Sequence, residues 1–406
     1  MSTEPSAAAT PLSDDEIAAL RAATPGTATV VHLNHAGASL PSRRTLDVQL
    51  GHLGREAEIG GYEAAAESEE ADARVYRSIA ELIGAQPSEI ARLEHATAAW
   101  NAAFWSVPMA EGQRILTANA AYGANAIGFL RAVERRGIRI DVVPDDEHGQ
   151  VDVAELERRI GDDVCLVAIT HAPTNGGLVN PAERVGAVTR AAGVPYLLDA
   201  CQSVGQRVID VEAIGCDLLS STGRKYLRGP RGSGFLYASE RIIDRLTPDH
   251  PDHHGADWTA LDRYELRPDA RRFEHWEYNH AAWLGLGAAV EQATEIGMDR
   301  IQATVTELAD GFRDQLREAG HRVMDSGAQR CGLVTVAADG FDAAAVRHRL
   351  RSQGFNISIS TPASTLYDAT ARGLGNVLRL SVHYLTTADE LDRTIPALRD
   401  AIRDTA

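Results

Sequence analysis

The sequence has few positive charges for its size and no long apolar run. Its 40 lysine and arginine residues are outnumbered by 57 aspartate and glutamate residues, so the net charge is −17 at neutral pH. Nucleic-acid recognition normally needs a basic face, and this balance therefore argues against a nucleic-acid binder. No apolar stretch approaches the ~20 residues of a membrane span, and no charged and then apolar leader precedes a small-residue cleavage site. We therefore expect a cytoplasmic, globular protein that binds neither nucleic acid nor membrane.

Cysteine is scarce as well. The four cysteines are Cys165, Cys201, Cys216 and Cys331. They are too few and too widely spaced for a disulfide framework or a CxxC metal site. A stretch of His and Asp residues around His253 has irregular spacing, which favours solvated side chains, so no metal is expected.

Lysine is almost absent, and this absence is the most informative one. Of the 40 basic residues 39 are arginine, and the one lysine is Lys225. An amine can lose its proton and form a Schiff base with a carbonyl, whereas a guanidinium stays protonated and cannot. The composition is biased so that arginine replaces lysine wherever a positive charge alone is needed. Lysine is thus retained where arginine does not suffice, unless Lys225 has escaped this bias by chance. The residues around it decide between the two interpretations.

The chain is long enough, at 406 residues, for two or three domains. From residue 30 onward short apolar runs alternate with helical patterns, which is typical of a mainly parallel sheet covered by helices on both faces. The expected strands are Val30–Asn34, Arg114–Ala118, Arg139–Pro144, Val164–Thr170, Tyr196–Ala200, Asp217–Thr222 and Gly232–Ser239, the last of which is open to an antiparallel direction. The expected helices between them are Glu69–Ile83, Thr97–Val107, Ala124–Arg136, Val153–Ile160 and Pro181–Ala192.

The pattern changes after residue 247. Residues 248–272 are rich in Pro, Asp, His and Arg and lack periodicity, so a long loop is expected there. Helices at about 281–296 and 300–319 and then three strands with two more helices follow. This second part predicts a smaller α+β domain.

Polar residues stand where two neighbouring strands end. Asp199 and Gln202 follow the strand at 196–200, and Lys225 follows the strand at 217–222. Ligands of open α/β sheets gather at the carboxyl ends of the strands. A buried carboxylate and the only lysine suit pyridoxal 5'-phosphate, because the amine holds its aldehyde and the carboxylate pairs with the protonated ring nitrogen. We therefore predict Lys225 and Asp199 as catalytic residues, although Asp199 taken alone is equally consistent with a helix cap or an ion pair.

Six motifs in order extend this pair into a family pattern. They are His95–Asn101 (HATAAWN), Asn119–Asn125 (NAAYGAN), Thr170–Gly177 (THAPTNGG), Asp199–Gln202 (DACQ), Thr222–Lys225 (TGRK) and Arg379–His383 (RLSVH). With these motifs the chain resembles the class V aminotransferases, pyridoxal-phosphate enzymes of fold type I, over nearly its whole length. Residues 58–62 and 229–232 are most similar to the branch of cysteine-conjugate C–S lyases and isopenicillin N epimerase-like enzymes, which includes ergothioneine- and lincosamide-pathway relatives.

The resemblance implies an architecture. The fold would be α/β, with a mainly parallel sheet of seven strands, helices on both of its faces and a smaller C-terminal α+β domain. An N-terminal extension with a short helix (residues 1–28) would pack with the small domain (276–406), and residues 29–275 would form the large domain that binds pyridoxal phosphate. A homodimer is also implied.

The resemblance further implies which residues hold the phosphate of the cofactor. Ala96 and Thr97 look like the turn at a helix N-terminus that binds it, and a helix N-terminus is a natural anion site. Thr222 and Arg224 would complete the phosphate site with a hydroxyl and a charged donor.

For the cofactor ring the resemblance implies three further contacts. Tyr122 occupies the position whose ring stacks on the pyridine, where many relatives have histidine instead. Gln202 and either Thr174 or Asn175 would hydrogen-bond the phenolic oxygen, because a one-residue slip in the alignment leaves both open.

On the substrate side, Arg379 matches the arginine that binds the α-carboxylate in a bidentate pair. Its place in an otherwise apolar strand favours this role over that of a surface arginine. Asn34 and His35 would be polar contacts to the substrate, although both are equally consistent with turn residues. The substrate would be a small-molecule amino acid such as a cysteine S-conjugate.

The reaction is left open by fold and cofactor, but one absence narrows it. Cysteine desulfurases of this family place a catalytic cysteine in the loop after the strand matched by Asn356–Ser360, and residues 357–368 contain none. We therefore expect β-elimination from a cysteine S-conjugate or its sulfoxide, with Lys225 as the base. Decarboxylating oxidative deamination, epimerisation and transamination remain alternatives, and so does a non-catalytic binding protein, which the complete residue set disfavours.

Overall fold

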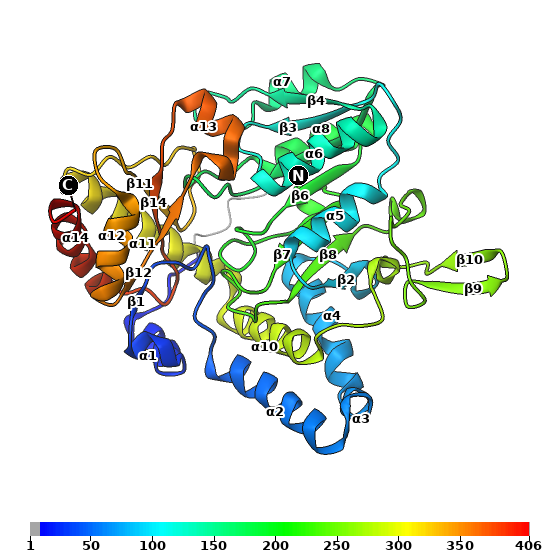
Figure 1. Cartoon of the computed structure of the whole chain (residues 1–406), viewed down its shortest axis with the longest axis horizontal. Helices are drawn as coiled ribbons and strands as arrows, with labels where there is room; N and C mark the ends of the chain where they lie inside the picture. The colour runs from blue at the N-terminus through cyan, green and yellow to red at the C-terminus, as the bar shows by residue number, and fades with distance from the viewer. Residues whose placement is uncertain (1–8, 406) are drawn as a thin grey trace.

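A seven-stranded sheet forms the centre of the larger part of the molecule in the computed structural model, which describes residues 9–405 (Figure 1). In spatial order its strands are β2 (Ile90–Leu93), β8 (Gly234–Ala238), β7 (Leu218–Thr222), β6 (Tyr196–Asp199), β5 (Val164–Thr170), β3 (Arg114–Ala118) and β4 (Arg139–Val143). The five strands from β7 to β4 run parallel, whereas β8 is antiparallel to β7 and β2 is antiparallel to β8. All seven residues of β5 are buried, which explains its continuous apolar sequence. The expected mainly parallel sheet is confirmed.

Helices cover both faces of this sheet. They are α4 (Glu69–Ile83), α5 (Ala96–Ser106), α6 (Gly123–Arg136), α7 (Val153–Arg159), α8 (Ala182–Ala192), α9 (Val211–Ile214) and α10 (His280–Ile296). On one face α5 and α6 bury an aromatic cluster around Trp100, Phe104 and Phe129 against the sheet. On the other face α4, α7, α8 and α10 pack on the remaining side chains of the strands. The structure therefore has the fold type I arrangement that the sequence predicts.

The smaller part has its own sheet and core. Its strands β11 (Leu333–Ala337), β14 (Val377–Ser381) and β13 (Ser358–Ser360) are antiparallel, with β14 in the centre. A parallel pair, β1 (Val31–His32) and β12 (Phe355–Asn356), lies beside them. The helices of this part are α11 (Met298–Glu318), α12 (Ala343–Ser352), α13 (Leu366–Arg372) and α14 (Ala388–Arg403). The expected first strand at 30–34 thus joins the smaller part, because an apolar run does not reveal its partner strand.

The N-terminal segment is tied to the smaller part. Helix α1 (Asp14–Ala22) begins with a capping box of Ser13 and Glu16. Its Arg21 pairs with the carboxylate of Glu390 on α14 at 2.8 Å.

Helix α10 packs instead against α4 and α2 (Arg43–Ile59), so its apolar side chains belong to the core of the large sheet. The division at residues 28 and 275 stays a prediction.

The segment expected to be an irregular loop contains a hairpin. Strands β9 (Ala256–Ala260) and β10 (Arg263–Leu266) pair antiparallel and project from the body of the molecule (Figure 1). Sequence patterning missed the hairpin because its large apolar residues Trp258, Leu261 and Tyr264 are exposed, so no buried face creates an alternation. Also unanticipated were β2, α2 and α3 (Gly61–Glu67). Short 3₁₀ helices occupy Pro25–Ala28, Pro87–Glu89, Ile243–Arg245, Ala270–Phe273 and Pro362–Thr365.

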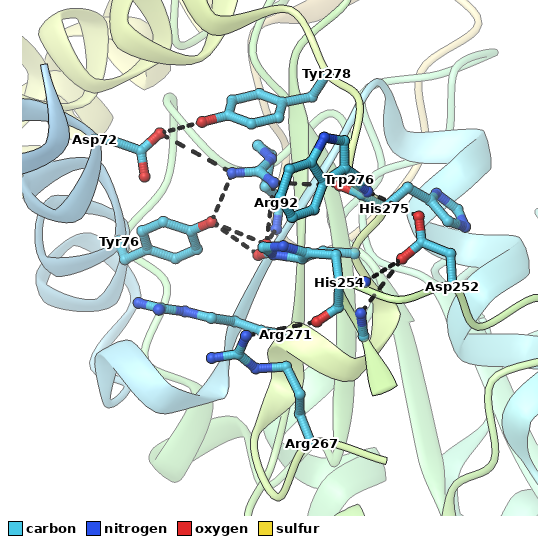
Figure 2. Close-up of polar contacts among 12 residues, drawn as sticks. Asp72, Tyr76, Arg92, Asp252, His254, Arg267, Arg271, His275, Trp276 and Tyr278 are labelled. Carbon is cyan, nitrogen blue, oxygen red and sulfur yellow. Dashed lines mark hydrogen bonds and ion pairs between the residues drawn. The ribbon is translucent and has the colours of Figure 1, made fainter. Parts of the chain in front are cut away.

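A polar network fixes the chain after this hairpin to α4 and β2 (Figure 2). The carboxylate of Glu274 accepts hydrogen bonds from Tyr76 Oη at 2.9 Å and from the Arg92 backbone N–H at 2.8 Å, and lies 3.0 Å from His254 Nε2. Burial alone would raise the pKa of Glu274, but His254 and Arg92 together hold it below its usual value. The Arg92 guanidinium lies 3.2 Å from the centre of the Tyr278 ring, a cation–π contact. Tyr278 is therefore part of this network.

None of the helices in residues 9–405 has the length and apolar character needed to cross a membrane.

Candidate active site

A cavity of about 270 Å³ opens at the carboxyl ends of β5, β6 and β7. Nine predicted cofactor contacts line it, namely Ala96, Thr97, Tyr122, Thr174, Asp199, Gln202, Thr222, Arg224 and Lys225, whereas Asn175, the alternative to Thr174, does not. Seven residues without a predicted role line it too, namely His95, Asn125, Thr170, Ala172, Cys201, Arg231 and Gly232. Strand ends and helix starts that are far apart in sequence thus meet in one place.

Asp199 is the buried carboxylate of the cavity. It is only 6% exposed, and Asn125 Nδ2 donates a hydrogen bond to its Oδ2 at 2.8 Å. Burial raises the pKa of Asp199, and the bond from Asn125 and the charge of Lys225 act against this rise. A carboxylate in such a place is stabilised by a cation, and the protonated nitrogen of a pyridine ring is a suitable one.

Asn125 is the contact that sequence reasoning missed. It stands three residues after Tyr122, in the first turn of α6. Tyr122 is the N-cap of α6, and residues three apart at the start of a helix lie near each other. The predicted role of Tyr122 in the site could therefore have pointed to Asn125.

The opposite end of the cavity is suited to a phosphate. Helix α5 begins at Ala96, and the first N–H groups of a helix have no partner within it. His95 caps the helix by accepting a bond from the Ala98 N–H through Nδ1 at 3.0 Å, which leaves the amides of Ala96 and Thr97 for an anion. The Arg224 guanidinium on the same cavity donates to the Gly37 carbonyl and adds positive charge.

Lys225 lines the same cavity, and the loop that carries it is held firmly. At Gly223 a Cβ would clash with Ser233 Oγ and lie 2.8 Å from Leu286 Cδ1, so a larger residue would force these side chains to move. Arg228 is the one non-glycine residue with a positive φ, 64°, among residues 9–405. Its buried guanidinium offsets this strain by donating to the Leu40 carbonyl and to Tyr384 Oη, both at 3.0 Å. The backbone beside Lys225 is therefore preorganised.

The two residues that are open for the phenolic oxygen are placed differently. Thr174 lines the cavity, whereas Asn175 Nδ2 donates to Thr365 Oγ1 at 2.8 Å and lies outside it. Gln202 Nε2 donates to the Ala36 carbonyl at 3.2 Å, and its Oε1 is buried without a partner within residues 9–405. Thr174 and Gln202 therefore both line the cavity, and their contact with the phenolic oxygen stays a prediction.

The three predicted substrate residues lie outside this cavity. Arg379, on the central strand β14 of the smaller sheet, donates from Nη1 to Thr174 Oγ1 and thus borders it. Its Nε is buried without a partner in the described part of the chain, and burial lowers its pKa. Such a guanidinium is ready to receive a carboxylate. Asn34 forms an isolated parallel β-bridge with Ser381 through the backbone. The side-chain Oδ1 of Asn34 is likewise buried without a partner among residues 9–405.

His35 does not line the cavity, and its contact with the substrate stays a prediction. Its ring stacks on that of His383 at 4.4 Å, and its Nδ1 lies 2.9 Å from Ser39 Oγ. The side chain is 2% exposed, packs against the ring of His383 and does not line the cavity. The small residues next to His35 in the sequence are compatible with a substrate contact. The aromatic stack with His383 depends on tertiary structure and cannot be predicted from those residues.

These buried histidines make folding sensitive to acid. Burial holds the pKa of His35 and of His383 well below 6.5, and it lowers the pKa of His171 to about 3. Below pH 6.5 the unfolded chain therefore binds protons that the folded chain does not. The free energy of unfolding then decreases as the pH is lowered. For His171 we expect a loss of about 2 kcal/mol between pH 6.5 and pH 5, and His35 and His383 act in the same direction.

Urea denaturation across this pH range measures the loss. The His171→Gln variant should lose about 2 kcal/mol less than the unaltered protein over the same range. A matched control is His148→Gln, because the His148 side chain is 51% exposed and should not affect the slope. An unfolding free energy that is flat from pH 7 to pH 5 would contradict the prediction.

The cavity fits pyridoxal phosphate on structural grounds. It combines a buried carboxylate, a helix N-terminus with a nearby arginine, and a lysine amine. No group of three or more His, Cys, Asp or Glu side chains in residues 9–405 is arranged to hold a metal ion. Fold and cavity together define a pyridoxal-phosphate-dependent enzyme of fold type I.

Comparison with known proteins identifies the family. The model of the aminotransferase class-V family matches residues 32–394, and the chain belongs to this family. Over 97% of its length it is 30% identical to a probable hercynylcysteine sulfoxide lyase from Mycobacterium tuberculosis, of which the match covers 95%. It is 32% identical over 224 residues, 55% of the chain, to a probable cysteine desulfurase from Methanothermobacter thermautotrophicus, and this match spans only 56% of that relative.

Solved structures agree with this fold. The crystal structure of a cysteine desulfurase from Escherichia coli superimposes with a TM-score of 0.88 at 19% identity, covering 96% of this chain and 99% of the other.

Proposed function

We propose that the protein is a C–S lyase that performs β-elimination on a cysteine S-conjugate or its sulfoxide. The observation that carries the proposal is the loop after β13, which lies beside the cavity but contains no cysteine. Its Ala363 carbonyl lies against Gly123, next to Tyr122, and its Thr365 bonds to Asn175. A desulfurase needs a nucleophilic thiol to take up sulfur, and this loop offers hydroxyl and apolar side chains instead.

Two further features support elimination over desulfuration. Cys201 is the one cysteine that lines the cavity, and burial raises the pKa of its thiol, so it is a poor nucleophile. The mycobacterial relative, similar to this chain over almost its full length, is named a probable sulfoxide lyase.

The residues of the chain divide the work of such a reaction. When bound, pyridoxal phosphate supplies an electron-accepting ring that makes the proton on the substrate α-carbon acidic. Arg379 binds the α-carboxylate, and Thr174 orients that guanidinium. Lys225 Nζ removes the α-proton, and Asp199 keeps a proton on the ring nitrogen. The sulfur on the β-carbon then leaves as a thiol or sulfenic acid, and water converts the remainder to pyruvate and ammonia.

Product analysis tests this proposal. Incubated with a panel of cysteine S-conjugates and their sulfoxides, the cofactor-loaded protein should release pyruvate, ammonia and the sulfur fragment in equal amounts, as measured by mass spectrometry. L-Alanine, which has no leaving group on its β-carbon, is the control and should give no pyruvate. A product that retains its sulfur would contradict elimination and favour transamination, decarboxylating deamination or epimerisation.

Removal of Arg379 should weaken substrate binding. We expect Arg379→Ala to raise KM by about 100-fold, the effect of losing hydrogen bonds to a charged group, with a smaller effect on kcat. The matched control is Arg317→Ala, because Arg317 pairs with Asp314 on the surface of α11. Steady-state kinetics with one conjugate decide the matter, and an unchanged KM would remove Arg379 from the substrate site.

We also propose a homodimer. Apolar side chains are exposed on α2, α3 and α6, including Leu50 and Leu53, Tyr62 at 76% and Ile127 at 67%. Exposed apolar residues of this size are typical of a surface that a partner subunit covers. A further hollow, lined partly by α5 and α6, adjoins the cofactor cavity at Thr97, so a second copy seated there would lie close to the reacting groups.

A further inference from the structure

Cys201 touches both catalytic side chains. Lys225 Nζ lies 3.2 Å from Cys201 Sγ, within hydrogen-bond distance for sulfur. The backbone N–H of Cys201 donates to Asp199 Oδ1 at 3.1 Å. Among residues 9–405 this sulfur is the hydrogen-bond partner that the structure records for the free lysine amine. Cys201 therefore marks the place where that amine rests.

We propose that Cys201 is a positioning residue that holds the Lys225 amine beside the reacting carbon whenever the amine is not bonded to the cofactor. The inference rests on the proposed role of Lys225 as the base, but not on cleavage of a C–S bond. It concerns any reaction of this site that moves an α-proton.

The chemistry of lysine explains why such a residue is needed. Its charged group sits on a flexible four-carbon stem, so a released amine can adopt many positions. Proton transfer, however, requires the amine to stay within about 3 Å of the proton that it removes. A partner that limits the stem to one position keeps the base close to the α-carbon.

The chemistry of the thiol explains why cysteine suits the task. A neutral thiol is a weak hydrogen-bond partner, so it fixes the position of the amine without withholding the amine from the substrate. Burial raises the pKa of the Cys201 thiol, although the charges of Lys225 and Arg224 act against this rise and that of Asp199 adds to it. The sulfur thus stays neutral and forms no permanent ion pair with the lysine.

The single lysine of the chain allows a direct test. Protein grown with lysine carrying ¹³C at the ε position shows one side-chain Cε signal in an NMR spectrum, that of Lys225. In the cofactor-free protein, Cys201→Ala should move this signal, whereas Cys165→Ala should not, because Cys165 Sγ bonds to the Arg114 carbonyl outside the cavity. An unmoved signal in Cys201→Ala would overturn the inference.

The second readout is exchange of the α-proton of L-alanine with solvent deuterium. In the cofactor-loaded protein we expect Cys201→Ala to lower the maximal exchange rate by up to about tenfold, the upper end of what one uncharged hydrogen bond contributes, with KM within about twofold. Cys201→Ser, which restores a hydrogen-bonding group of similar size, should remain within about threefold of the unaltered enzyme. The visible absorbance of each variant shows that its cofactor content is equal.

The outcomes separate this inference from the proposed function. Exchange by the unaltered enzyme without any C–S cleavage would defeat the proposed function and leave this inference standing. If Cys201→Ala exchanges as fast as the unaltered enzyme, or Cys201→Ser is as slow as Cys201→Ala, the thiol has no positioning role. If the unaltered enzyme exchanges no α-proton, the inference falls.

Discussion

Replacement of Lys225 by arginine should abolish catalysis while the protein stays folded. Arginine keeps the positive charge and much of the length of the stem, but its guanidinium neither forms a covalent bond to an aldehyde nor accepts a proton near neutral pH. We expect kcat to fall by about 10⁴-fold or more, because one substitution removes both the covalent anchor and the general base. The visible absorbance of the bound cofactor should also shift, since the lysine link is lost.

The control for this variant is an arginine-to-lysine exchange elsewhere. Arg158 is a suitable site, because its side chain is 72% exposed and pairs with Glu155 on the surface of α7. Arg158→Lys should keep full activity and an unchanged spectrum. If Lys225→Arg were to retain measurable turnover above the level of Lys225→Ala, or the original absorbance, the assignment of Lys225 would be wrong.

The Asp199→Asn variant should be the next most damaging. Asparagine has the same shape and accepts hydrogen bonds, but it cannot stabilise a protonated ring nitrogen. We expect a loss of about 10²–10³-fold in kcat, comparable to the removal of one preorganised electrostatic contact from an active site. Cofactor affinity should also weaken, as followed by the absorbance of the protein during titration with pyridoxal phosphate.

A carboxylate at the other end of the same strands provides the comparison. Asp217 precedes β7 and accepts the Tyr196 N–H at 2.9 Å, remote from the cavity. Asp217→Asn should alter stability without altering cofactor binding. Equal effects of the two substitutions on kcat would show that Asp199 acts through the fold alone.

The parts of the site that the sequence predicts are those fixed by local structure. Asp199, Thr222 and Lys225 follow parallel strands whose ends meet at one edge of the sheet, and Thr97 starts a helix at that edge. A pattern of apolar strands is enough to bring such residues together, because the sheet topology leaves few other arrangements. The nine predicted cofactor residues therefore line one cavity, although their contacts with the cofactor remain a prediction.

The parts that escaped prediction depend on tertiary packing. The partner of His35 is His383, almost 350 positions away, and nothing near His35 indicates an aromatic stack. The hydrogen bond from Arg379 to Thr174 depends on how strand β14 of the smaller sheet is placed relative to the large sheet. Trp258 and Tyr264 form a projecting hairpin with exposed apolar side chains, which is contrary to the burial pattern on which strand prediction relies.

The covalent link itself provides the most direct test of the account. The cofactor-loaded protein is treated with borohydride, which makes a lysine–cofactor bond permanent, and is then digested and mapped by mass spectrometry. Pyridoxal phosphate should be found on the peptide that contains Lys225, in a yield that matches the cofactor content. A modified N-terminal amine with an unmodified Lys225, or a protein that remains colourless with excess cofactor, would contradict the account.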